Sequence, residues 1–178
     1  TPASCTRERA RSARTSSGRR TSSADRPFAR RVTLVRLERL RSPGAMTPRE
    51  CGDCTVCCSV MAVTELRKAS RRSCEHVGPE GCRIHPERPA SCREFHCLWL
   101  RGAVAGDEAL RPDALGVMFD YFVTRGTGEE HLIAFELWPG ALDEPAARSL
   151  LEELARTHEL RLSYRDGRWS SLGPDSPP

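Results

Sequence analysis

The sequence predicts a small α+β protein, in which a loop-rich cysteine block packs on an antiparallel hairpin or sheet with one C-terminal helix. Eight of the nine cysteines lie within the 47 residues from Cys51 to Cys97, where few apolar residues are available to form a core. After this block, apolar residues first alternate with period two, as in strands, and then recur with the helical period. A chain of 178 residues suits one such domain with a tail.

The charges divide the chain into two parts. Residues 1–45 contain 12 arginines and three acidic residues, whereas residues 46–178 contain 16 basic and 21 acidic residues. Low hydrophobicity and like charge predict a disordered basic tail over 1–45, with a basic arm for nucleic acid or anionic lipid as the alternative. Met46 is the first methionine, so we expect the folded domain at 46–172, before a frayed terminus at 173–178. A start codon placed too far upstream would account for the tail.

The cysteine block at 51–97 is predicted to consist of loops and short helical turns. The apolar residues between 60 and 66 are spaced as one face of a short helix. Residues 78–81 (GPEG) form a turn signal, and prolines at 86 and 89 exclude a continuous helix through this part of the block. With so little apolar surface to bury, the block needs another source of stability.

The remainder, 98–172, is predicted to form the α+β half. Val117–Val123 and His131–Trp138 alternate apolar and polar residues around a glycine-containing turn, which predicts an antiparallel hairpin. An apolar stripe over 144–158, with Asp143 as the N-cap, predicts a helix that lies on the sheet.

Two short strands are expected after that helix. Leu160, Leu162 and Tyr164 alternate with other residues as in a strand, before the tight-turn pair Asp166-Gly167. The residues after this turn are expected to form the second strand. The bulky Trp99 and Trp138 are expected in the core rather than in a binding site.

The spacing of the cysteines indicates metal binding through thiolates. CxxC is a common metal-binding motif of zinc ribbons and iron–sulfur proteins, because two intervening residues let both sulfurs reach one metal centre. Adjacent cysteines rarely share one tetrahedral centre, so we expect Cys57 and Cys58 to serve different centres or one of them to lie outside the ligand shell. Zinc and iron, including a [4Fe–4S] cluster, are both allowed, in one or two centres. The predicted ligands are Cys51, Cys54, Cys57, Cys58, Cys74, Cys82, Cys92 and Cys97.

The clustering of the cysteines in closely spaced CxxC pairs favours metal ligation in a reducing cytoplasm over a disulfide framework. Buried cysteines without a ligand role are the other alternative.

Histidines and arginines within the block are further candidates. The histidines that could replace a sulfur are His76, His85 and His96. The arginines that could offset thiolate charge by N–H···S contacts, or simply form a solvated face, are Arg83, Arg88 and Arg93.

The residues that carry these cysteines suggest a family. The stretches CGDCTVCC at 51–58 and GCRIHPERPASCREFHC at 81–97, with Cys74 between them, resemble the zinc- or iron-chelating CxxCxxCC domain (YkgJ-like). The resemblance covers about residues 46–100 and implies metal chelation, mostly in bacterial proteins without an assigned activity. A related cluster in flagellin lysine N-methylase adds methyl transfer as an alternative. His85 stands where many relatives have tyrosine, which favours it slightly as a ligand.

The predicted function is therefore metal binding, with metal ions as the partners and no protein partner assigned. The alternatives are an iron–sulfur redox or methyl-transfer enzyme component and a zinc-ribbon nucleic-acid-binding module. We do not expect nucleic-acid binding, because the folded part is acidic, nor membrane insertion, because no apolar run approaches the roughly 18–20 residues of a spanning helix. No catalytic residue is assigned: phosphate-loop, GxSxG and HExxH motifs are absent, and Asp120 and Glu136 are expected to be solvated carboxylates that could share one face of the hairpin.

Overall fold

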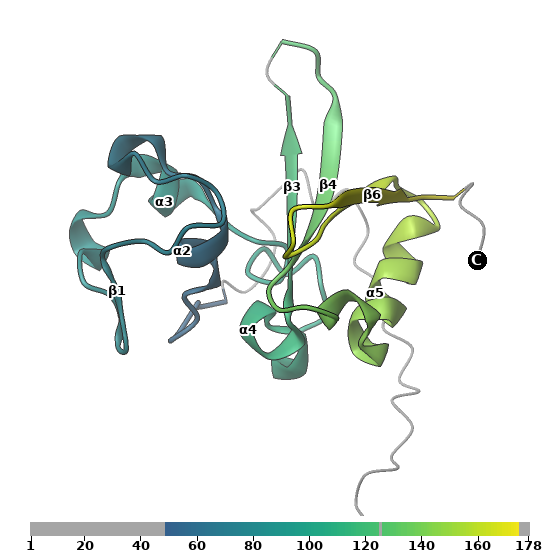
Figure 1. Cartoon of the computed structure of the whole chain (residues 1–178), viewed down its shortest axis with the longest axis horizontal. Coiled ribbons are helices and arrows are strands. Elements are labelled where there is room, and N and C mark those ends of the chain that lie inside the picture. The colour runs from purple at the N-terminus through teal and green to yellow at the C-terminus, as the bar shows by residue number, and fades with distance from the viewer. Residues whose placement is uncertain (1–48, 125, 175–178) are drawn as a thin grey trace, which may run out of the picture.

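A computed structural model describes residues 49–124 and 126–174 and shows an α+β fold (Figure 1). The predicted basic tail at 1–45 lies outside these residues, as does the end of the predicted frayed terminus. The helices and strands are, in chain order, α2 (Val56–Val60), η1 (Thr64–Leu66), β1 (Val77–Gly78), β2 (Gly81–Cys82), η2 (His85–Glu87), α3 (Ala90–Glu94), η3 (Glu108–Leu110), α4 (Pro112–Leu115), β3 (Val117–Val123), β4 (Glu130–Glu136), η4 (Ala141–Asp143), α5 (Pro145–Ala155), β5 (Leu160–Ser163) and β6 (Trp169–Leu172).

The main sheet has the strand order β3-β4-β5-β6. β3 and β4 form the expected hairpin, with Val117 opposite Glu136 and Val123 opposite Glu130. β5 and β6 are also antiparallel, but β4 and β5 are parallel, so the sheet is mixed rather than antiparallel as expected. The reason is the connection through α5, which returns the chain to the same end of the sheet, as a parallel pair requires.

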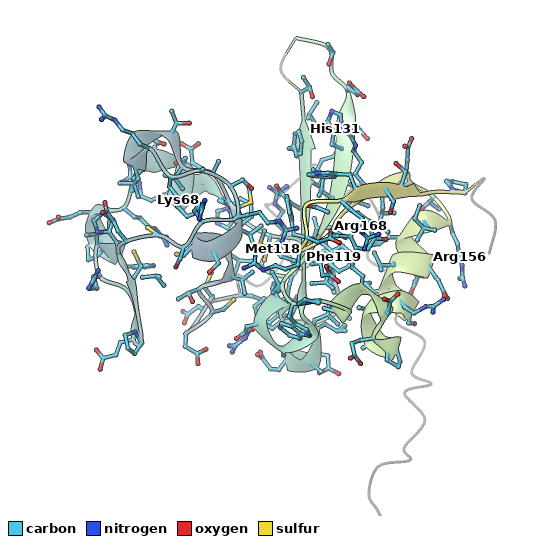
Figure 2. All side chains as sticks on the ribbon, viewed as in Figure 1. Lys68, Met118, Phe119, His131, Arg156 and Arg168 are labelled. Carbon is cyan, nitrogen blue, oxygen red and sulfur yellow. The ribbon has the colours of Figure 1, made fainter. Side chains whose placement is uncertain are left out.

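The sheet has a different apolar partner on each face. On one face, strand residues such as Phe119 and Leu132 pack with Leu150 and Leu154 of α5. This packing confirms that the predicted helix lies on the sheet, although its N-cap is Glu144 and the expected cap Asp143 belongs to the preceding turn η4. Figure 2 shows Phe119 near this helix.

On the other face, the sheet packs against the cysteine block. Met118, Ile133 and Phe135 contact Val60 of α2, and Cys57 and Cys97 are half-buried against the same cluster. The block thus covers the face opposite α5 (Figure 1). Because adjacent residues of a strand point to opposite faces, the alternation within β3 supplies both apolar layers.

The block itself has little regular structure. The helix lies earlier than predicted: α2 ends at Val60, Met61 is extended, and only the 3₁₀ turn η1 follows. The turn at 78–81 is present between the two-residue strands β1 and β2, and the helical turns on either side of Pro89 are separate, as expected. The apolar spacing at 60–66 therefore marks residues that pack from two short turns rather than from one helix.

The two tryptophans expected in the core differ. Trp99 is buried, whereas 43% of Trp138 is exposed. Trp138 nevertheless covers the backbone at Gly116, where a Cβ would collide with its ring and lie 2.8 Å from the Cβ of Ala141. Gly116 has a φ of 78° and ends α4 immediately before β3. No helix within residues 49–124 and 126–174 is long and apolar enough to cross a membrane.

Arg71 connects the cysteine block to the sheet. Its guanidinium donates to the carbonyl of Glu136 at 2.5 Å and to the carbonyl and hydroxyl of Ser163 at 2.5 and 2.7 Å. It also lies 5.7 Å from the centre of the Phe135 ring, and its backbone N–H donates to the Val60 carbonyl. One residue thereby joins the ends of two parallel strands to α2, the strands through its side chain and α2 through its backbone.

We predict that Arg71→Gln lowers the free energy of unfolding by about 2–4 kcal/mol, because hydrogen bonds from a charged group contribute about 1.5–3 kcal/mol each. Urea denaturation measures the change. The neighbouring Arg72→Gln is the matched control, since Arg72 is exposed and has no side-chain hydrogen bond to the described residues. Equal effects of the two substitutions would contradict the role of Arg71.

Glycine is required at position 116 for two reasons. Gly116→Ala combines positive φ with a collision against Trp138, so we expect a loss of roughly 2–5 kcal/mol of stability. Gly140 has a φ of 85° with nothing within 4 Å of a Cβ, so Gly140→Ala should cost only the backbone strain of roughly 1 kcal/mol. Thermal or urea unfolding of both variants separates the steric effect from the backbone strain. Similar losses of stability in the two variants would contradict a steric role for Trp138.

Candidate metal centre

The eight cysteines of the block are all free thiols, and their backbone positions are set by short turns. Cys51 and Cys54 belong to one turn, in which the Cys54 N–H donates to the Cys51 carbonyl at 3.0 Å. Cys57 and Cys58 follow on α2, where neighbouring residues point about 100° apart. The short helix therefore directs two adjacent thiols to different sides.

The first cysteine group consists of Cys51, Cys54, Cys57 and Cys97. Burial raises the pKa of Cys97 to about 11, with smaller contributions from nearby Cys51 and Cys54 and with the N–H groups of Leu100 and Trp99 opposing the shift. Cys57 likewise lies within electrostatic reach of Cys51 and Cys54. Cys57 and Cys97, from different parts of the block, thus both lie within electrostatic reach of Cys51 and Cys54.

The second cysteine group consists of Cys58, Cys74, Cys82 and Cys92. The Cys74 N–H donates to the Cys58 carbonyl at 2.9 Å, which brings these two residues together. The pKa of Cys92 is raised first by burial and then by Cys58, with Cys74 and Cys82 adding to it. All four, and Cys57 as well, line one cavity of about 210 Å³, together with apolar side chains that include Val63, Ile84 and Phe95.

Cys57 and Cys58 join the two groups. The Cys57 thiol donates a hydrogen bond to Cys58, which lowers the pKa of Cys58 to about 6 and raises that of Cys57 well above its usual range. Cys58 is consequently the best stabilised thiolate of the pair. Its charge is further favoured by Lys68 and Arg88.

Cations accompany both groups. Lys68, labelled in Figure 2, lies near Cys58, Cys74 and Cys92 and donates to the Met61 carbonyl. Arg111 lies near Cys51 and Cys54 and pairs with Asp53 at 2.9 Å and with Asp113 at 2.7 Å.

Arg49 completes this set of cations. It lies near Cys97 and donates to the carbonyls of Trp99 and Val104 at 2.6 and 2.9 Å. Because its guanidinium also stacks 5.2 Å from the centre of the Trp99 ring, it fixes the chain just before the first cysteine.

The arginines expected near the thiols take different positions. Arg88 lines the 210 Å³ cavity and acts electrostatically on Cys51 and Cys58. Arg83 is exposed and donates to the Glu75 carbonyl, and Arg93 is exposed and donates to the Arg88 carbonyl at 2.6 Å. Lys68, Arg49 and Arg111 were not predicted, since no spacing rule links them to the cysteines.

The three candidate histidines have other partners. His85 Nε2 lies 2.8 Å from Nη1 of Arg88, and His96 Nδ1 lies 2.8 Å from the Glu94 carbonyl. His76 Nε2 lies 3.4 Å from a carboxylate oxygen of Glu75. None of the three lines the cavity of the second cysteine group.

Within the described residues, no three His, Cys, Asp or Glu side chains are arranged to hold one metal ion. The donors themselves fit a thiophilic metal, since each group offers four free thiols beside cationic side chains. The cysteines lie on α2, α3, β2 and their connecting loops.

Comparison of the chain with protein-family models, with curated proteins and with solved structures finds no match.

The two carboxylates considered as catalytic candidates lie on opposite faces of the sheet and are both buried. Asp120 is 5% exposed and Glu136 is 4% exposed, so neither is solvated as expected. Glu136 accepts hydrogen bonds from the N–H groups of Gly140 and Arg165 at 2.8 and 2.6 Å. Burial raises the pKa of Asp120, although Arg101 and the Tyr121 N–H oppose this shift.

A raised pKa in the folded state means that ionisation of Asp120 favours unfolding. We therefore expect wild-type stability to fall as the pH rises through the ordinary Asp pKa of about 4 towards the folded value. Asp120→Asn removes this loss, so its stability relative to wild type should increase from pH 3 to pH 7 in urea denaturation. Asp143→Asn, which removes an exposed carboxylate, controls for the substitution, and a pH-independent difference for Asp120→Asn would contradict the prediction.

Proposed function

We propose that this protein binds zinc or iron through two four-cysteine sites, one formed by each cysteine group. The observation that carries the proposal is the gathering of eight free thiols in one block. Cys58, Cys74, Cys82 and Cys92 line one cavity together with Cys57. Cys97 lies within electrostatic reach of Cys51 and Cys54. The sequence pattern CxxCxxCC at 51–58 supports it as well. Four thiolates are a standard ligand set for structural zinc and for iron–sulfur clusters.

The adjacent pair on α2 supports a division into two sites. Cys57 faces the sheet side, where it packs with Cys97 against the apolar cluster of Met118. Cys58 carries the lowered pKa and lies within reach of Lys68. A helix cannot readily point two successive side chains at one tetrahedral centre, so each serves its own group.

The cations support thiolate ligation. Four thiolates around a divalent ion leave a net charge of −2, which is costly in partly buried surroundings unless cations lie near. Arg49 and Arg111 meet this need at the first cysteine group. Lys68 and Arg88 meet it at the second.

Bound metal would supply cross-links to a block that has few buried apolar residues. Val60 and Val63 are the only apolar residues of 49–97 in the described core. The residues of the chain itself hold the turns in place: Glu65, for example, accepts from the N–H and hydroxyl of Ser91 at 3.2 and 2.9 Å. Metal binding and folding of the block are therefore coupled.

Metal and acid-labile sulfide analysis of anaerobically prepared full-length protein tests the proposal. We expect about two zinc ions or two iron centres per chain. Cys54→Ser should remove one equivalent, Cys82→Ser the other, and the double variant both. Cys5→Ser, outside the block, is the matched control and should retain full metal content.

A strong chelator should also make the block at 51–97 sensitive to protease, while the β3 to β6 sheet stays protected. A protein that takes up no zinc or iron would contradict the proposal. Complete metal loss from either single variant would instead indicate one shared centre and contradict the division into two.

A further inference from the structure

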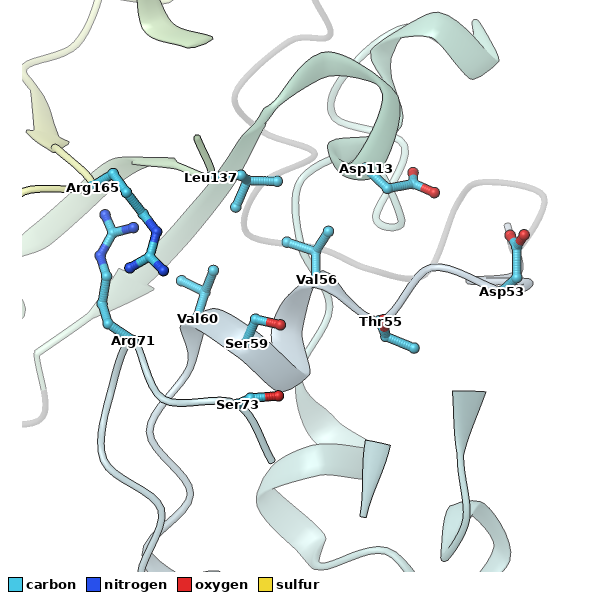
Figure 3. Close-up of a pocket in the computed structure, with 10 residues that line it drawn as sticks. All are labelled: Asp53, Thr55, Val56, Ser59, Val60, Arg71, Ser73, Asp113, Leu137 and Arg165. Atoms are coloured by element: carbon cyan, nitrogen blue, oxygen red, sulfur yellow. The ribbon is translucent and has the colours of Figure 1, made fainter. Parts of the chain in front are cut away.

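A second, polar cavity lies on the side of α2 away from the cavity of the second cysteine group. It has a volume of about 430 Å³ and contains no cysteine among its lining residues. Its walls come from α2, from residues 71–73, from the start of α4, and from the chain after β4 and β5. Figure 3 shows the guanidinium groups of Arg71 and Arg165 side by side at one end of it.

The positive charge at this end is not balanced by the surrounding side chains. Arg71 is committed to the carbonyls of Glu136 and Ser163, but the side chain of Arg165 has no hydrogen bond or ion pair with the described residues. The buried carboxylate of Glu136 acts electrostatically on Arg71 and also on Arg168. The pKa of Arg71 is lowered mainly by burial and secondly by the positive charge of the neighbouring Arg165.

The acidic residues at the other end do not compensate this charge. Asp53 and Asp113 both pair with Arg111, at 2.9 and 2.7 Å. They also lie apart from the two guanidinium groups in Figure 3.

The remaining walls offer hydroxyl groups and apolar surface. Thr55, Ser59 and Ser73 line the cavity, and none has a side-chain hydrogen bond to another described residue. Val56, Val60 and Leu137 form an apolar part between them. Guanidinium and hydroxyl donors beside apolar side chains are the groups that bind an oxyanion attached to a short hydrocarbon.

We propose that this cavity binds a small organic oxyanion, a carboxylate or phosphate with a short apolar part. Arg165 binds the oxyanion with its free guanidinium, Arg71 adds charge from a fixed position, and Ser59 or Ser73 donates a hydroxyl. The apolar part lies against Val60 and Leu137. This site is distinct from the proposed metal sites, because no cysteine lines it, although most of its walls belong to the cysteine block and need that block to be folded.

NMR titration of ¹⁵N-labelled full-length protein tests the proposal with inorganic phosphate, acetate and butyrate as probes. We expect saturable shifts of the Ser59 and Val60 amides and of the Arg165 Nε–H, with tighter binding of butyrate than of acetate. Phosphate shifts without butyrate shifts would assign the site to phosphates, and the reverse to carboxylates. Absence of saturable shifts with every probe would overturn the proposal. Equal binding of acetate and butyrate would show that Val60 and Leu137 do not bind the apolar part of the ligand.

Arg165→Gln should weaken binding at least about tenfold, because it removes a charged, bidentate donor. The variant keeps the backbone N–H that Glu136 accepts, and unchanged amide shifts in α5 would verify its fold. Arg156→Gln is the matched control, since it removes the same charge from an exposed residue after α5 (Figure 2). Equal weakening in both variants would show general charge attraction and overturn the site.

Discussion

The packing of the cysteine block on the sheet depends on the hydrogen bonds of Arg71. The block has only a small apolar contact with the sheet, around Val60 and Met118. The Arg71 guanidinium donates hydrogen bonds to two adjacent parallel strands. Because its donors are fixed in one plane, these bonds fix the orientation of the block on the sheet. Arg71 holds α2 at one distance from β4 and β5, and α2 in turn positions Cys57 and Cys58.

Long side chains from distant parts of the sequence recur as the connections of the block. Arg49 reaches the carbonyls around Trp99, and Arg111 reaches Asp53 from the second half of the domain. Both guanidinium groups also lie near thiols. The same residues therefore anchor the loops and place positive charge beside the cysteines, in a block of short turns that has few buried apolar residues of its own.

The sequence predicts the regular half of the fold well and the site only in part. β3 matches its predicted bounds because period two is a local pattern. The parallel pairing of β4 with β5 is not local, and neither is the burial of Asp120 and Glu136, which depends on layers packed on both faces. The spacing predicts the cysteines as ligands, but which of them come within reach of one another depends on the fold, as the influence of Cys51 on Cys97 shows. Lys68 and Arg111 carry no motif, so only the folded chain places them.

Helix α2 forms part of the wall of both proposed sites. Cys57 and Cys58 face the cysteine groups, whereas Val56 and Ser59 face the cavity with Arg71 and Arg165. With only five residues, this helix has no interior that could move independently of either side. Substitutions within α2 would therefore disturb both sites together. Cys54, Cys82 and Arg165 lie outside the helix, and changes at these positions separate thiolate ligation from oxyanion binding.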